Sequence, residues 1–164
     1  MVTNSSKRQK PVKRPSAIVN KRATFDYAID SGGELIVGIA LTGPETRAAR
    51  DGHIQLKGSF VTVRVGELWL NNASFSLKIN EKNKPGARTI DTEPRKLLAK
   101  RKQIDELYAR KQTGMTIVPL RLLTKGRYIK VVIALGKGKK NYDKRETLKR
   151  RDQEREASRA MKNL

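Results

Sequence analysis

Short runs in which apolar and polar residues alternate dominate the middle of the chain, between residues 34 and 135. A period of two residues is typical of β-strands that bury one face. Gly38 marks a bend within the first run, and Asn71-Asn72 interrupts the third run with a turn or bulge. The predicted strands are residues 34–42, 58–65, 68–79, 115–124 and 127–135.

A helical period replaces this alternation between residues 94 and 112, where apolar side chains recur at the spacing of one helix face. Asp91 or Thr92 suits the N-cap of this helix, and Gly114 suits its end. A shorter helix is predicted at residues 45–49. The apolar stripe of the longer helix consists of Leu97, Leu98, Ile104, Leu107 and Tyr108.

Residues 78–91 are rich in Lys, Asn, Pro and Gly, and they predict a loop between the strands and the late helix. Five or six short strands with one helix inserted late predict a mainly β fold. We expect a small closed antiparallel β-barrel of the oligonucleotide- and oligosaccharide-binding (OB) type, with one or two accessory helices and flexible basic tails. An α+β sandwich is the alternative.

The two ends of the chain carry the highest density of positive charge. Residues 1–22 hold seven Lys and Arg and no acidic residue, whereas residues 136–164 hold 11 Lys and Arg against five Asp and Glu. Residues 1–19 have no apolar period and contain two prolines, so we expect a disordered basic arm that either contacts nucleic acid or only raises solubility. Residues 20–135 then form the barrel, and residues 136–164 form a basic tail.

The basic tail opens with Gly136-Lys137-Gly138-Lys139-Lys140, which predicts a mobile hinge and not a strand interior. A helix is predicted from Asp143 to about Lys162, but it has too few apolar residues to pack on the barrel. We therefore expect a tail that is disordered in isolation and becomes helical on an RNA or ribonucleoprotein surface.

Composition narrows the possible partners and functions. The 164 residues include 37 Lys and Arg against 16 Asp and Glu, a net charge of +21, which favours an anionic polymer as partner. The absence of Cys excludes thiolate chemistry and Cys-ligated zinc. No apolar run approaches the roughly 20 residues of a membrane span, and the apolar segment of a secretory leader is missing. We expect a cytoplasmic protein without a metal, a cofactor or a membrane partner.

The candidate catalytic residues are few, and none forms a recognisable constellation. His53 is the only histidine, and a lone imidazole is typical of a surface or hydrogen-bonded structural residue. Glu45 and Asp51 are flanked by Arg47 and Arg50, which hold both carboxylates ionised. Two interpretations of these carboxylates remain as alternatives: a structural salt bridge, or hydrogen bonds to RNA. We predict a binding protein and not an enzyme.

Aromatic residues that stand among cations can stack on unpaired bases. For Phe25, Trp69 and Tyr108, burial in the core is the favoured interpretation. Tyr142 differs, because four cations surround it in the segment 139–145 and no core residue is predicted nearby. We therefore predict that Tyr142 stacks on a base or a sugar.

Several motifs stand in a fixed order along the chain. They are Asn20-Lys21-Arg22-Ala23 with Asp26-Tyr27, residues 38–47, Arg95-Lys96-Leu97-Leu98 at the expected helix start, residues 114–120, Lys137-Gly138-Lys139-Lys140-x-x-Asp143-Lys144-Arg145, Lys149-x-Arg151 and Arg159-Ala160-Met161-Lys162. Together they resemble the family of small protein B (SmpB), the SsrA-binding proteins of bacterial trans-translation. The resemblance runs from about Asn20 to Lys162, and the motif after the last strand is its most specific part.

Three positions depart from the family pattern. The family usually has Glu-Ala-Gly where this chain has Ile36-Val37-Gly38, and that glutamate is one of the family's RNA-binding positions. Glu34, two residues earlier on the same strand face, is the candidate substitute. Pro44 replaces a usual Trp or Thr, and Tyr142 replaces a usual His.

The resemblance implies an OB-type barrel that binds the tRNA-like domain of transfer-messenger RNA and stands in for the missing anticodon arm. It also implies that the alanylated RNA travels with elongation factor Tu to stalled 70S ribosomes. There the tail enters the decoding centre and the empty mRNA channel and contacts small-subunit ribosomal RNA. A structural ribosomal protein, or another basic OB-fold protein that binds ribosomal RNA, is the alternative.

By the same resemblance, two groups of residues contact RNA. The residues implied for the tRNA-like domain are Asn20, Lys21, Arg22, Glu45, Arg47, Lys96, Leu97 and Leu98. Those implied for the ribosome are Lys137, Lys139, Lys140, Tyr142, Asp143, Lys144, Arg145, Lys149, Arg151, Arg155, Met161 and Lys162. We expect Lys21, Arg22, Glu45 and Lys96 to share one RNA-facing surface, because none of the four is needed for a core.

Overall fold

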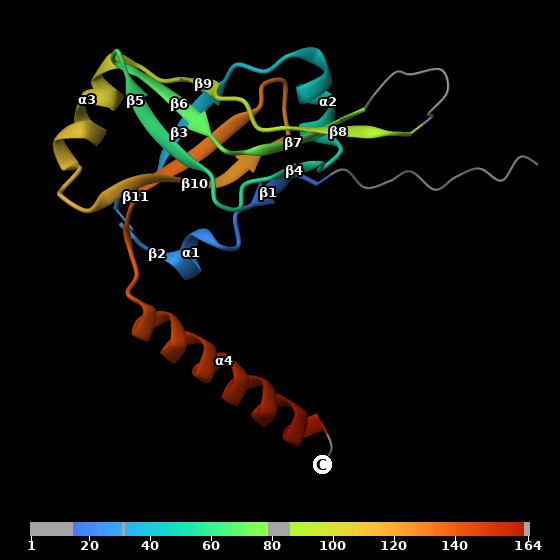
Figure 1. Cartoon of the computed structure of the whole chain (residues 1–164), viewed down its shortest axis with the longest axis vertical. Helices are drawn as coiled ribbons and strands as arrows, with labels where there is room; N and C mark the ends of the chain where they lie inside the picture. The colour runs from blue at the N-terminus through green and yellow to red at the C-terminus, as the bar shows by residue number, and fades with distance from the viewer. Residues whose placement is uncertain (1–14, 31, 79–85, 163–164) are drawn as a thin grey trace, which may run out of the picture.

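Six antiparallel strands close into a barrel in the computed structural model of the chain, which describes residues 15–30, 32–78 and 86–162 (Figure 1). Each strand pairs with the next, and pairing between the first and the last closes the ring. Around the barrel the order is β10 (Met115–Leu123), β5 (Phe60–Arg64), β6 (Glu67–Asn71), β9 (Arg95–Leu98), β3 (Leu35–Ile39) and β11 (Lys130–Gly138). The prediction of a mainly β fold with a closed barrel of OB type is confirmed.

Smaller elements surround this barrel. β1 (Ala17–Val19) pairs with β10, and β2 (Tyr27–Ile29) pairs with the end of β11. A second sheet contains β4 (Ile54–Gln55), β7 (Ser74–Lys78) and β8 (Arg88–Asp91). Within the described ranges the helices are α1 (Ala23–Asp26), α2 (Gly43–Arg50), α3 (Arg101–Arg110) and α4 (Asn141–Lys162).

The barrel interior is filled by the apolar residues that the alternating pattern placed on one strand face. Leu68 and Leu70 on β6, Leu122 on β10 and Ile133 on β11 are fully buried in one continuous core. Their neighbours along each strand point to the other face, as the pleat requires. The five predicted strands therefore correspond to real strands, and the break at Asn71-Asn72 separates β6 from β7, with Asn72 at a φ of 57°.

The predicted helix over residues 94–112 is wrong in its first third. Arg95–Leu98 is strand β9, which pairs with β6 and β3, and the helix begins only at Arg101. A four-residue run with two leucines fits either period, and pairing with two neighbouring strands decides for the strand. Lys100, not Asp91 or Thr92, occupies the N-cap position, and its backbone N donates a hydrogen bond to Gln103 Oε1 at 2.9 Å. Tyr108 is 65% exposed, outside the core.

The predicted loop over residues 78–91 is wrong at both ends. Lys78 ends β7, and Arg88–Asp91 forms β8, which pairs with β7 from Lys78↔Arg88 to Phe75↔Asp91. Residues 79–85, the middle of that loop, lie outside the described residues. β8 has only one apolar residue, Ile90, which is exposed, so backbone pairing forms this strand without a hydrophobic pattern.

The predicted hinge at Gly136 is also wrong, because strand β11 continues to Gly138. Gly136 pairs with Thr116 on one side and with Ile29 on the other. A Cβ atom at Gly136 would lie 3.1 Å from Ile29 Cδ1 and Tyr27 Cβ. Glycine is needed here for the close approach of β2, and the barrel ends at Gly138 and not at residue 135.

The ends of the chain bring one more correction. Ala17–Val19 was expected in a disordered arm, but it forms β1 and pairs with Leu123, Leu122 and Arg121. Residues 1–14 of the predicted arm lie outside the described residues. The short helix predicted at residues 45–49 is confirmed as α2, and the tail is helical as α4, which leaves the barrel beside α1 (Figure 1).

Candidate nucleic-acid interface

The residues implied to bind the tRNA-like domain fall into separate places on the molecule. Lys21 and Arg22 precede α1, Arg47 lies on α2, and Lys96 and Leu98 lie on β9. Figure 1 shows α1 beside the start of α4, at the opposite end of the barrel from α2. The expected single surface with Lys21, Arg22, Glu45 and Lys96 is therefore wrong.

Glu45 is a structural residue and not part of an exposed surface. Its side chain is buried, with 7% of the residue exposed. Oε2 accepts hydrogen bonds from Thr42 N at 2.6 Å and from Thr42 Oγ1 at 2.8 Å, which forms a capping box at the start of α2. Oε1 accepts a hydrogen bond from Arg95 Nε at 2.8 Å. The prediction that Glu45 faces RNA is wrong; Glu45 forms a structural salt bridge, and its partner is Arg95, not the flanking Arg47 or Arg50.

Charge and burial act in opposite directions on Glu45. Burial raises the pKa of Glu45, but hydrogen bonds from Thr42 and the Arg95 guanidinium outweigh it, so this pKa lies below its usual range. Arg95 is buried as well, pairs with Asp91 at 2.7 Å, and lies 4.2 Å from the centroid of the Phe75 ring. This buried network joins α2 to β8 and β9 and was missed by the sequence reasoning.

Asn20 and Leu97 are the other two implied contacts that the structure buries. Asn20 Nδ2 donates to Pro119 O at 2.9 Å, and its Oδ1 accepts from Arg22 N at 3.3 Å. Leu97 belongs to the barrel core. Their side chains are occupied in holding the fold, so the expected contacts from Asn20 and Leu97 to RNA are not supported by their positions.

The remaining implied residues of β9 lie on an outward face of the barrel, together with exposed residues of the neighbouring strand β3. Lys96 and Leu98 alternate with the buried Arg95 and Leu97, so they point away from the core. Leu98 pairs with Gly38 on β3, and Leu98 and Ile36 are each 55% exposed. We name this area, with residues Ile36, Gly38, Lys96 and Leu98, the β3–β9 face. Two apolar side chains beside a cation suit contact with a nucleotide.

Lys96 and the candidate substitute Glu34 each have an ionic partner on the barrel. Lys96 Nζ lies 2.5 Å from Glu67 Oε1, and both side chains are about half exposed. Glu34 Oε2 accepts a hydrogen bond from an Arg121 guanidinium nitrogen at 2.6 Å. The carboxylate of Glu34 is therefore paired with a residue of β10, and its side chain is still 44% exposed.

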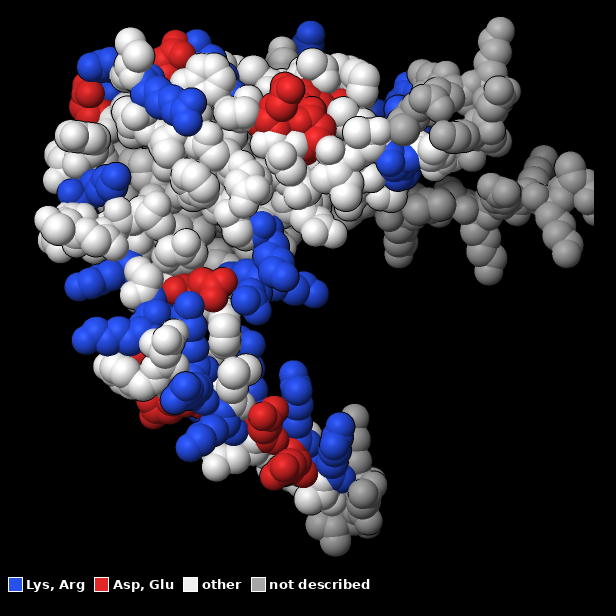
Figure 2. All heavy atoms as spheres, viewed as in Figure 1, with Lys and Arg blue, Asp and Glu red and all other residues white. Residues whose placement is uncertain are grey.

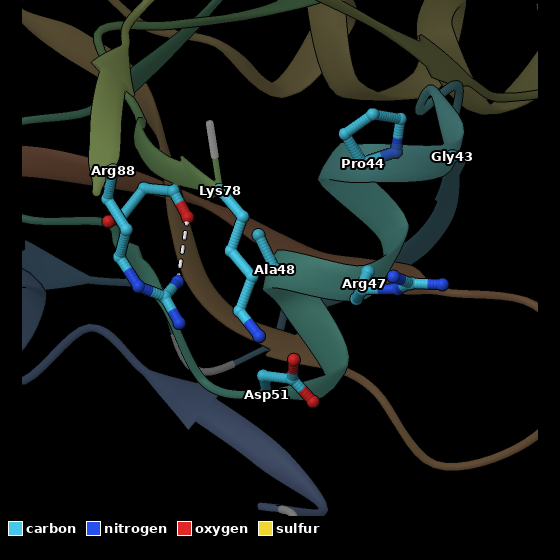
Figure 3. A pocket seen from close by; sticks show the side chains of 8 residues that line it. Gly43, Pro44, Arg47, Ala48, Asp51, Lys78 and Arg88 are labelled. Carbon is cyan, nitrogen blue, oxygen red and sulfur yellow. Dashed lines mark hydrogen bonds between the residues drawn. The ribbon is translucent and has the colours of Figure 1, made fainter. Parts of the chain in front are cut away.

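A cleft of about 300 Å³ lies between α2 and the β7–β8 hairpin (Figure 3). Lys78 and Arg88 extend from the hairpin side by side, with Asp51 below Lys78 and Arg47 on the helix pointing away from the hairpin. Arg88 donates a hydrogen bond to Ser76 O at 3.1 Å. Lys78 and Arg88 were not predicted as candidates, because residues 78–91 were interpreted as a loop. These cations suit phosphate oxygens.

The tail gathers cations along a single helix. Figure 2 shows Lys and Arg side chains along α4 and at its junction with the barrel, while the barrel face in the same view is largely uncharged. Nearly all described side chains of α4 are exposed from Arg145 onward. The exposed residues among the implied ribosome contacts are Lys137, Lys140, Tyr142, Arg145, Lys149, Arg151, Arg155 and Met161. Lys162 is the last residue of α4.

Tyr142 lies in the first turn of α4 and is 64% exposed. The negative charge of Asp143 and a hydrogen bond to it raise the pKa of the Tyr142 hydroxyl. A tyrosine ring is neutral at physiological pH even without this shift, which suits the predicted stacking role. Asp143 Oδ2 accepts a hydrogen bond from Lys140 N at 3.2 Å, so Asp143 also holds the start of the helix.

Residues 15–30, 32–78 and 86–162 contain no group of three or more His, Asp or Glu side chains placed to hold a metal ion. Among the same residues, no helix combines the length and the apolar character that crossing a bilayer demands.

A closed OB-type barrel with exposed basic surfaces and a projecting basic helix belongs to the class of nucleic-acid-binding proteins. The family model described as SmpB protein matches residues 17–163, and the chain belongs to this family. An SsrA-binding protein of Shouchella clausii is 46% identical over 144 residues, which cover 87% of this chain and 89% of the relative. An SsrA-binding protein of Streptococcus pyogenes is 45% identical over 147 residues, 88% of this chain and 90% of the relative.

A solved structure gives the same result at the level of the fold. It is described as "tmRNA-SmpB: a journey to the center of the bacterial ribosome", and one of its chains superimposes with a TM-score of 0.57 at 32% sequence identity. The match covers 77% of this chain and 87% of the other. The family resemblance drawn from the motifs is thereby confirmed.

Proposed function

We propose that this chain binds transfer-messenger RNA and acts in the rescue of stalled ribosomes by trans-translation. The observation that carries the proposal is the combination of an OB-type barrel with a projecting basic helix, in a chain that the SmpB family model matches over residues 17–163. Relatives named SsrA-binding protein and a structure of SmpB with transfer-messenger RNA support it. The chain acts as a binding factor in the cytoplasm, without a catalytic residue or a cofactor.

The barrel binds the tRNA-like domain through the β3–β9 face and the neighbouring cleft. α2 follows β3 after a short connection, and β8 precedes β9, so both walls of the cleft continue into the two strands of that face. Arg47, Lys78, Arg88 and Lys96 supply cations for phosphates, while Leu98 and Ile36 offer apolar surface to sugars and bases. Ile36 removes a carboxylate that the family usually has here, so this face contacts RNA through apolar surface and cations.

The tail binds the ribosome. α4 carries exposed Lys and Arg side chains from its first turn to its last, which suits a helix that contacts phosphates and is not packed on a core. It occupies the decoding centre and the empty mRNA channel, contacts small-subunit ribosomal RNA, and presents Tyr142 for stacking. The alanylated transfer-messenger RNA arrives bound to elongation factor Tu, with this chain in place of the missing anticodon arm.

Sequencing of RNA that copurifies with the full-length chain from its own cells tests the proposal. We expect a single dominant transfer-messenger RNA. An Arg47→Glu/Lys96→Glu variant loses it, whereas the control Lys102→Glu, an exposed change on α3, retains it. The alternative is a structural ribosomal protein. It would be identified if only ribosomal RNA copurified and if this RNA stayed bound during washing with 0.5–1 M salt, roughly the ionic strength that screens surface contacts.

A further inference from the structure

Tyr128 is an exposed aromatic residue of the barrel that has no place in the interface described above. It belongs to residues 124–129, which join β10 to β11 and which we name the β10–β11 turn. Tyr128 is 68% exposed, although its neighbour Ile129 is buried in the barrel core. An aromatic ring that stands outside the core of a protein with a net charge of +21 suits stacking on a nucleic-acid base.

Cations accompany this ring in the same turn. The guanidinium carbon of Arg127 lies over the Tyr128 ring, 5.4 Å from its centroid, and Lys125 is exposed. Among residues 15–30, 32–78 and 86–162, neither Lys125 nor Arg127 has a carboxylate partner. Within that part of the chain the two charges remain available to phosphate oxygens, and the exposed ring remains available to a base.

Helix α2 holds the β10–β11 turn in place. A guanidinium nitrogen of Arg50, the last residue of α2, donates hydrogen bonds to Arg127 O at 3.2 Å and to Gly126 O at 3.4 Å. The backbone that carries Tyr128 is therefore ordered before any partner arrives. Preorganisation of this kind lowers the entropic cost of binding, because less of the turn has to be fixed when a base stacks on the ring.

The turn lies at the end of β11 that is remote from the tail. β11 runs for nine residues from Lys130 to Gly138, about 26 Å at the usual rise of a strand, and α4 follows its far end (Figure 1). Beside the turn, Lys130 pairs with Gly38 on β3, and Gly38 pairs with Leu98 on β9. Tyr128 therefore lies next to the β3–β9 face and far from the start of α4.

We propose that Tyr128 stacks on an unpaired base of the tRNA-like domain of transfer-messenger RNA, and that Arg127 binds a phosphate beside that base. The inference rests on the proposed function, because it adds a contact with the same RNA. The position next to the β3–β9 face favours the tRNA-like domain over ribosomal RNA, which is the partner proposed for the tail at the other end of β11. An unpaired base is required, because only an unstacked base offers its face to a side chain.

The affinity of the full-length chain for a transcript of the tRNA-like domain tests this contact. We expect Tyr128→Ala to weaken binding about five- to twentyfold, through loss of one stacked base, and to leave the salt dependence of the affinity unchanged. Tyr128→Phe keeps the ring and should bind within about twofold of the parent chain. Arg127→Gln removes one phosphate contact, so it should weaken binding and reduce the salt slope by about 1.

Tyr108 on α3 provides a matched control. It is 65% exposed, much as Tyr128 is, but within the part of the chain that the structure describes no cation lies over its ring. Tyr108→Ala should therefore bind the transcript as the parent chain does. A photoreactive benzoylphenylalanine at position 128 should crosslink to an unpaired nucleotide of the tRNA-like domain, whereas the same group at position 108 should not.

Unchanged affinity of Tyr128→Ala would overturn this proposal and leave the proposed function standing, because the parent chain still binds the RNA. A loss for Tyr128→Phe as large as that for Tyr128→Ala would also overturn it, since the hydroxyl and not the ring would then make the contact. So would a crosslink from position 128 that reaches only ribosomal RNA on stalled ribosomes. If the parent chain itself does not bind the transcript, the proposed function fails and this contact fails with it.

Discussion

At the scale of single residues, Glu45 shows how a carboxylate in a basic protein serves the fold. Replacing it with Gln leaves the Arg95 guanidinium buried without its charged partner on α2. We expect Glu45→Gln to lower the free energy of unfolding by about 3 kcal/mol, measured by urea denaturation at pH 7. The control Glu67→Gln removes the half-exposed partner of Lys96 and should cost less than about 1 kcal/mol. Similar losses for both variants would contradict this prediction.

The pH dependence of stability provides an independent check on Glu45. Because its folded-state pKa is lowered, its contribution is complete above its unfolded pKa of about 4.3 and is lost as the pH falls through the folded-state pKa. The difference in unfolding free energy between the parent chain and Glu45→Gln should therefore shrink below about pH 4. A difference that stays constant from pH 7 to pH 3 would mean that the carboxylate charge contributes nothing.

Tyr142 belongs to the same scale, and its proposed role is contact with the ribosome. Its ring is exposed at the start of α4 among cations, so Tyr142→Ala removes a stacking surface without disturbing the barrel. We expect peptide tagging on stalled ribosomes to fall about tenfold, while affinity for free transfer-messenger RNA stays within about twofold. Tyr142→His should retain most activity in the same reconstituted assay. Equal activity of Tyr142→Ala and the parent chain would leave Tyr142 as a linker residue.

At the scale of elements, sequence periodicity predicted the strands whose side chains are buried in the core better than the strands that form through backbone pairing. Strands whose side chains enter the core, such as β6 with Leu68 and Leu70, were predicted because alternation records burial. β8 and β1 were missed because backbone pairing with β7 and β10 forms them, and pairing over long distances leaves no local pattern. β9 was predicted as helix because Leu97-Leu98 fits both periods until its two neighbours are known.

The candidate site was predictable to a similar degree. The exposed cations of the tail follow from composition alone, since residues 136–164 offer no core to bury them. Motif resemblance, however, does not distinguish a residue that touches RNA from one that holds the fold. In this chain the side chains of Asn20, Glu45 and Leu97 all make contacts within the fold. Lys78 and Arg88 entered the candidate interface only once the β7–β8 hairpin placed them opposite α2.

Gly136 and Gly138 allow a test of the corrected strand end. A methyl group at Gly136 would lie 3.1 Å from Ile29 and Tyr27, whereas one at Gly138 meets nothing within 4 Å. We expect Gly136→Ala to cost about 1–3 kcal/mol of stability through displacement of β2. Gly138→Ala should change stability by less than about 0.5 kcal/mol. Thermal melting of both variants checks this, and equal melting temperatures would restore the interpretation of this segment as a hinge.

At the scale of the whole molecule, barrel and tail divide the work of one RNA-binding protein. The barrel closes on its own core, and the last strand of that barrel, β11, ends at Gly138. Beyond it, Lys139 donates a hydrogen bond to α1, and α4 contacts α1 through an ion pair and a cation–π contact. Partly exposed contacts of this kind contribute little to the stability of the barrel. We therefore expect the two parts to be separable in stability.

Truncation after Gly138 tests this division of work. The truncated chain keeps β11 whole with its pairing to β2, so we expect a cooperative thermal transition within a few degrees of that of the parent chain. Binding to free transfer-messenger RNA should persist, because the β3–β9 face and the α2 cleft are intact, whereas tagging on stalled ribosomes should be lost. Truncation after Leu135 is the matched comparison: it removes the pairing partners of Tyr27, Ala28 and Ile29 and should destabilise the barrel. If the chain ending at Gly138 unfolds as readily as the chain ending at Leu135, α4 stabilises the barrel and the two parts are not separable.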